Sequence, residues 1–198
     1  MRSLTNFPCP EQYVSRFPLV CIIAFALAAP PAAAAQDLLD LKSATHLRSE
    51  YLIDMTSVHD NILALAHAIP ADKYGWRPAP GVRSIAEALM HVAGEWYVIG
   101  PLSVGVRPPA GFAVPKDGMA KLEKITAKAE VLAELDKAWA HSRATIEGAD
   151  SAMLLGRYEP ARMSLARAAL RVSGDLHEHL GQLIAYARSV GVTPPWSK

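Results

Sequence analysis

The chain is poor in cysteine, and this limits the chemistry that it can perform. Among its 198 residues there are two cysteines, Cys9 and Cys21, and both fall within the first 35 residues. We predict below that these 35 residues are removed. A mature chain without cysteine forms no disulfide and offers no thiol nucleophile or thiolate ligand to a metal. Any site chemistry would therefore depend on histidine and carboxylate side chains.

The chain also lacks an apolar run of the length that a membrane-spanning helix needs. Its amino-terminal apolar stretch, residues 17–29, follows Arg2 and Arg16 and is shorter than the roughly 20 residues that cross a bilayer. Prolines and the small-residue sequence Ala33-Ala34-Ala35 come after it. Residues 1–35 are therefore predicted to be a cleaved signal peptide. A retained membrane anchor is the alternative interpretation.

Export would place the mature protein in the periplasm or outside the cell, with no stable membrane insertion after cleavage. Residues 36–198 contain equal numbers of basic and acidic residues and have the length of one domain. Without a basic excess, binding to nucleic acid is not expected.

Glycine and proline are missing from residues 36–69, where apolar side chains recur every three or four residues. This pattern predicts a long amphipathic helix that ends before Pro70. Ser84 and Glu87 have the spacing of a capping box and predict the start of a second helix. Prolines and glycines between residues 100 and 118 predict a long connection.

A third helix is predicted from about Met119 to Ile146, and a fourth after Arg162, ending before Gly191. Each of the four helices has a single apolar stripe, which it can bury only against the others. The predicted fold is therefore all-α, an up-down four-helix bundle with long loops that occupies residues 36–198.

Polar side chains of metal-ligand type line the edge of the apolar stripe on the second and fourth helices. His91 and Glu95 are one turn apart on the second helix, and Asp175 and His179 are one turn apart on the fourth. Residues two apart on a helix point roughly 200° away from each other, so His177 cannot share the face of His179. We interpret His177 as a surface residue.

His59 falls within the apolar stripe of the first helix. It can be a buried histidine with a hydrogen-bond partner or a fourth ligand, and we favour the buried histidine because no second ligand type lies near it.

Two segments carry a resemblance to a known family. The sequence WRPAPGVRSIAEALMHVAGEW, from Trp76 to Trp96, and the sequence SGDLHEHLGQLIAYARSVGVTPPWS, from Ser173 to Ser197, resemble the DinB/YfiT-like family. The resemblance implies a bundle that holds one divalent ion through three histidines, one from the second helix and two from the fourth. His91 and His179 match two of them, and Asp175 stands where the family usually has histidine.

From this comparison we expect a metal site of His91, Asp175 and His179, with Glu95 as a ligand-orienting residue or a general base. Two imidazoles and a carboxylate suit zinc and also ferrous iron. We expect zinc, with iron, nickel and manganese as alternatives. The expected function is that of a metal-dependent hydrolase or small-thiol transferase with an unidentified small-molecule substrate.

Three other features of function stay open in the sequence. The protein can be a non-catalytic periplasmic protein that binds a metal or a small ligand. A haem-binding bundle, with Met55 and His179 as axial ligands, is less favoured because the strip beside His179 is polar. Association into a homodimer is possible.

Overall fold

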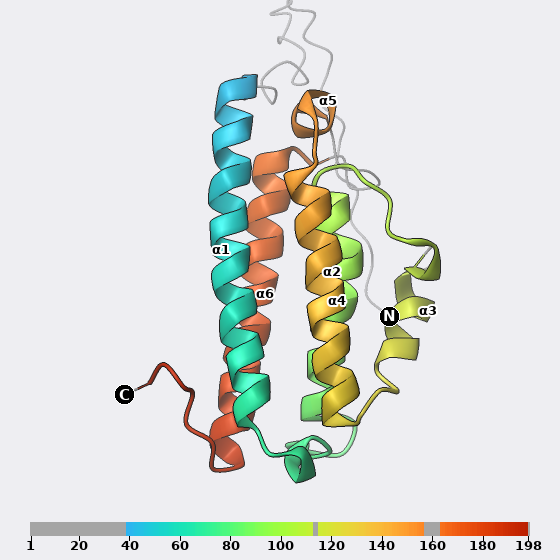
Figure 1. The fold of residues 1–198 in the computed structure, drawn as a ribbon, viewed down its shortest axis with the longest axis vertical. Helices are drawn as coiled ribbons and strands as arrows, with labels where there is room; N and C mark the ends of the chain where they lie inside the picture. The colour runs from blue at the N-terminus through green and yellow to red at the C-terminus, as the bar shows by residue number, and fades with distance from the viewer. Residues whose placement is uncertain (1–38, 113–114, 157–162, 198) are drawn as a thin grey trace, which may run out of the picture. The chain divides into compact units, whose positions relative to one another are not determined.

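The structure is a computed structural model that describes residues 39–112, 115–156 and 163–197. The predicted signal peptide lies outside these residues. Within them the secondary structure is helical and contains no strand, which confirms the predicted all-α bundle with long loops. The bundle is built from four long helices that lie side by side: α1 (Leu41–Ala68), α2 (Ile85–Ser103), α4 (Lys128–Glu147) and α6 (Leu165–Ser189) (Figure 1).

Side chains cap the amino-terminal ends of α1 and α2. At α1, Asp40 Oδ1 accepts a hydrogen bond from Ser43 N at 2.7 Å. At α2, Ser84 Oγ accepts from Glu87 N at 3.2 Å, and Glu87 Oε2 accepts from Ser84 N at 2.7 Å. These contacts satisfy backbone donors that a helix start leaves free, and they form the predicted capping box.

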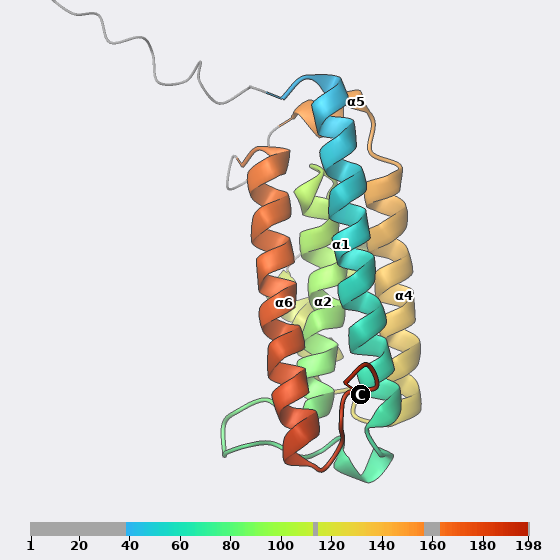
Figure 2. The ribbon, with the colours of Figure 1, turned by 90° about the vertical axis from the view of Figure 1, so that its left-hand side faces the viewer.

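The four long helices do not simply alternate in direction along the chain. Lys128, at the start of α4, donates to the carbonyls of His67 and Ile69 at the end of α1. Near the other end of α4, Arg48 of α1 donates to the carbonyl of Glu147. Helix α4 therefore runs antiparallel to α1 and parallel to α2 (Figure 2), and the connection from α2 to α4 crosses the length of the bundle (Figure 1).

This crossover corrects the predicted third helix, which is two helices rather than one. Helix α3 (Pro115–Leu122) packs on the outside of α2, and α4 begins only at Lys128. The turn between them contains the β-branched residues Ile125 and Thr126, which are weak helix formers. A single straight helix could not pack outside α2 and then enter the bundle, so the break is needed.

Two further boundaries differ from the prediction. Helix α2 continues through Pro101 to Ser103, although proline has no N–H to donate to the carbonyl of Tyr97 one turn earlier. A short helix, α5 (Ser151–Leu155), lies in the stretch expected to be irregular. Asp150 caps it by accepting from Met153 N at 2.9 Å.

Each long helix contributes a fully buried side chain to one core: Met55, Trp96, Leu135 and Leu176, all at most 1% exposed. Burial of a side chain of this size stabilises the fold by about 1.5–3 kcal/mol, so packing rather than any cross-link holds the helices together. Among the described helices, none combines the length and the apolar character needed to cross a membrane.

Candidate metal centre

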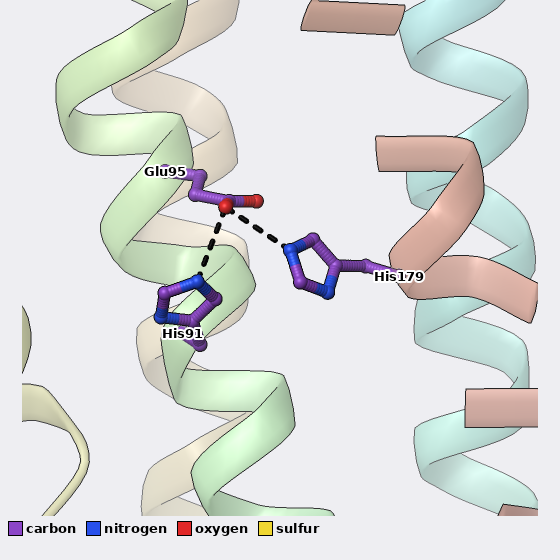
Figure 3. Close-up of side chains that lie close together, drawn as sticks. All are labelled: His91, Glu95 and His179. Carbon is purple, nitrogen blue, oxygen red and sulfur yellow. Dashed lines mark hydrogen bonds and ion pairs between the residues drawn. The ribbon is translucent and has the colours of Figure 1, made fainter. Parts of the chain in front are cut away.

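One histidine ring from α2 and one from α6 both approach the carboxylate of Glu95 (Figure 3). His91 Nε2 lies 3.2 Å from Glu95 Oε1, and His179 Nε2 lies 3.1 Å from the same oxygen. The two rings are edge to face, with centroids 5.1 Å apart. One turn of α2 separates His91 from Glu95, and α6 brings His179 to them from a distant part of the sequence.

The three side chains form a compact group of metal-ligand type. One ligand atom from each of His91, Glu95 and His179 can be chosen so that all lie within 4.8 Å of one another. The Glu95 side chain is only 5% exposed, whereas those of His91 and His179 are 17% and 18% exposed. The carboxylate is thus enclosed by the bundle, and the two rings border solvent.

Each histidine ring is also held at its other nitrogen. His91 Nδ1 lies 3.1 Å from Glu123 Oε1, and His179 Nδ1 lies 3.3 Å from Gln182 Oε1. Gln182 Nε2 in turn donates to the Tyr186 hydroxyl at 3.0 Å. With Nδ1 occupied, the Nε2 atom of both rings is directed toward Glu95.

The pKa values show how the charges of this group interact. Burial of Glu95 would raise its pKa, but the hydrogen bonds and charges of His179 and His91 outweigh burial and lower it to about 2. The hydrogen bond to Glu95 raises the pKa of His179 above its ordinary value, although burial opposes this. In the protein alone, Glu95 is therefore an ionised carboxylate near neutral pH, and its charge and hydrogen bond stabilise the protonated form of His179.

Asp175 lies beside this group without being one of its three members. It is half-buried on α6, and its pKa is raised by burial and by the negative charge of Glu95. Two carboxyl groups therefore approach each other next to two imidazoles. The structure brings together His91, Glu95 and His179, and it places the expected ligand Asp175 at the edge of the group.

Comparison with known families identifies the family of the chain. A model of the DinB superfamily matches residues 55–183 of the chain. This chain belongs to the DinB superfamily. The matched segment includes both histidines of the group as well as Glu95 and Asp175. No curated protein matches the chain.

The residues of this DinB-superfamily protein fit a divalent ion. Their donor set is two imidazole nitrogens and a carboxylate, which are common ligands of zinc and of non-haem iron. Glu95 Oε2 is buried and has no hydrogen-bond partner among the described residues. A buried carboxylate with an unpaired oxygen and a second carboxyl group nearby is an arrangement that a cation would stabilise.

The other two histidines considered from sequence lie outside the group. His177 is exposed and its Nε2 lies 3.0 Å from Asp54 Oδ1 of α1, as expected for the face opposite His179. His59 is 7% exposed, stacks on Trp139 and contacts Asp60 through Nδ1 at 2.9 Å. It is a core histidine in the structure.

The sequence pointed to Glu95 but not to Glu123, which contacts His91 in the structure. The spacing of four residues between His91 and Glu95 was a visible signal, because it places both on one face of α2. Glu123 gave no comparable signal. It belongs to the turn between α3 and α4, and its contact with His91 depends on how α3 packs against α2.

Proposed function

We propose that this DinB-superfamily protein binds one divalent metal ion through His91, Glu95 and His179. The observation that supports the proposal most directly is the convergence of two imidazole Nε2 atoms on one oxygen of a buried carboxylate. Zinc is the expected ion because it accepts this donor set and leaves a coordination position for substrate. Iron, nickel and manganese are alternatives for the same ligands.

The geometry favours an exchange of the roles that the sequence suggested for the two carboxyl groups. Glu95 was expected to orient a ligand or act as a base, and the closeness of its Oε1 to both Nε2 atoms supports a ligand role instead. Asp175 was expected to be the ligand, yet it lies beside Glu95 at the edge of the group. We assign Glu95 to metal binding and Asp175 to proton transfer at the site edge.

We propose further that the site serves a metal-dependent hydrolase or small-thiol transferase. The chemistry that the ion would supply is Lewis-acid polarisation of a substrate carbonyl or activation of a thiol. The partly exposed rings of His91 and His179 leave one side of the site open to a small molecule. The chain itself provides fixed imidazoles on α2 and α6 and a carboxyl group, Asp175, that can accept or return a proton.

A non-catalytic exported metal-binding protein is the second candidate. The same ligand group supports it, and enzymatic activity distinguishes the two. A haem-binding bundle has less support, because the Met55 side chain that would have to reach the iron is packed in the core at 1% exposure.

Elemental analysis of the purified protein tests the metal proposal. Wild-type protein refolded with zinc should retain about one ion per chain, and His91→Ala and His179→Ala should lose most of it. His177→Ala is the matched control because it removes an imidazole two residues from His179 on the opposite face, and it should bind metal like wild type. Circular dichroism checks that each variant is folded. Wild-type protein that retains none of zinc, iron, nickel or manganese would contradict the proposal.

Catalysis and export need separate tests. A screen of hydrolase and thiol-transfer substrates should find activity that a chelator abolishes and added metal restores. A protein that binds metal but is inactive toward every substrate class would favour the non-catalytic candidate.

Amino-terminal sequencing of the exported protein should give Gln36 as its first residue. A membrane-bound chain that begins at Met1 would instead support the retained anchor.

A further inference from the structure

The α3–α4 turn reaches the back of the His91 ring. Glu123 Oε1 lies 3.1 Å from His91 Nδ1, and Arg83 Nε donates to the same oxygen at 2.9 Å. His91 Nε2 faces Glu95 Oε1 on the other side of the ring. The imidazole is thus placed between two carboxylates that belong to different elements.

From these contacts we infer that Glu123, held by Arg83, is a positioning residue that fixes the tautomer and orientation of His91. The inference rests on the proposed metal site. An ionised carboxylate only accepts hydrogen bonds, so Glu123 attracts the ring proton of His91 to Nδ1 in competition with Glu95, which attracts it to Nε2. The proton at Nδ1 leaves the Nε2 lone pair directed into the site, where a metal ligand needs it.

Close packing of α3 on α2 brings Glu123 within reach. A Cβ atom at Gly94 of α2 would lie 2.8 Å from Met119 Cγ of α3, a spacing that only glycine allows without a shift. Glu123 follows one turn after Met119, and its N–H donates to the Met119 carbonyl at 3.0 Å. The same approach that needs glycine at position 94 therefore places the carboxylate behind His91.

Arg83 restricts the Glu123 side chain. Arg83 directly precedes Ser84, the N-cap of α2, so its backbone is fixed by the capping box at the start of the helix that carries His91. Glu123 itself is only 27% exposed. The arginine and the histidine together leave the Glu123 carboxylate few alternative positions.

A comparable but uncharged arrangement supports the second ring. Gln182 Oε1 lies 3.3 Å from His179 Nδ1, and the Gln182 amide is oriented by its hydrogen bond to Tyr186. Both rings are therefore held from behind at Nδ1, one by a carboxylate and one by an amide. This shared pattern is what we expect where two imidazoles must present Nε2 to one point.

Zinc titration of matched variants tests the inference. Glu123→Ala should weaken zinc binding by roughly 10- to 100-fold, the range reported for loss of a hydrogen-bond partner behind a ligand. Glu123→Gln keeps an acceptor oxygen and removes the charge, so it should retain most of the affinity. Glu147→Ala removes a surface glutamate that pairs with Arg143 at 2.8 Å, and it should bind zinc like wild type.

The ring nitrogens of His91 provide a readout that needs no metal. In metal-free wild-type protein at alkaline pH, 15N NMR should show a substantial fraction of neutral His91 with its proton on Nδ1, because Glu123 competes with Glu95 for the ring proton. In Glu123→Ala the proton should move to Nε2, toward Glu95. The inference would be overturned if Glu123→Ala had the zinc affinity and the His91 tautomer of wild type. It would also be overturned if Glu123→Gln bound zinc as weakly as Glu123→Ala, because that result would indicate an effect of charge alone. Wild-type protein that binds no metal but shows the expected tautomers would contradict the proposed function alone.

Discussion

Asp175 on α6 lies close enough to Glu95 on α2 for the charge of Glu95 to raise the pKa of the Asp175 carboxyl group. Only Glu95, however, belongs to the group of ligand atoms that includes His91 and His179. The two carboxyl groups are neighbours with different surroundings. Their different positions allow the assigned roles to be separated by experiment.

Glu95→Gln should reduce zinc affinity by at least about tenfold, because an amide oxygen is a weaker ligand than a carboxylate. Asp175→Asn should change zinc affinity less and should reduce turnover with any substrate identified. Zinc titration and kcat measured on both variants check this. A larger loss of zinc in Asp175→Asn than in Glu95→Gln would return the ligand role to Asp175.

The pKa shifts predict how the stability of the metal-free protein depends on pH. The lowered pKa of Glu95 contributes stability that is present above its ordinary value of 4.5 and is lost as pH falls toward 2. The raised pKa of His179 contributes stability that is present below its ordinary value of 6.5 and is lost as pH rises through the raised value. Both contributions are therefore present between about pH 4.5 and 6.5.

Denaturant unfolding with chelator present can measure this dependence. The difference in free energy of unfolding between wild type and Glu95→Gln should be largest in that window and should decrease on both sides. A difference that does not vary with pH would show that Glu95 and His179 do not form the predicted pair in solution.

Substitutions of His59 test whether this residue belongs to the core or to the metal site. Its ring stacks on Trp139 with centroids 4.8 Å apart, and its buried Nε2 has no hydrogen-bond partner among the described side chains. His59→Phe should keep the stacking, remove the unpaired polar atom and leave the free energy of unfolding equal or higher. His59→Ala should lower it by about 2 kcal/mol or more through the cavity that it leaves.

The metal content of the His59→Phe and His59→Ala variants is the second measurement. Both variants should retain metal if they fold, because the ring lies among tryptophans rather than in the ligand group. Loss of metal from a folded His59→Phe variant would identify His59 as a fourth ligand.

The sequence predicted the bundle because periodicity and capping are local properties. The Ser84–Glu87 capping box and the stop before Pro70 depend on residues within one turn of each other, and both are present in the structure. The pairing of His91 with His179 could be expected because each lies on the polar edge of an apolar stripe.

Features that depend on packing between elements distant in the sequence could not be predicted from local patterns. The division of the third helix, the parallel course of α2 and α4, and the contact of Glu123 with His91 all follow from how α3 crosses the bundle. The choice between Glu95 and Asp175 depends on how α6 is placed along α2. Spacing along one helix does not determine that placement.

The contact between His179 and Glu95 joins positions that are 84 residues apart in the chain. An ion held by both would act as a reversible cross-link that closes this long loop, and such cross-links disfavour open states of the chain. The effect should be greatest where α6 separates from α2. Amide hydrogen exchange along the carboxy-terminal half of α6 should slow on zinc addition, whereas the start of α1 should exchange at an unchanged rate.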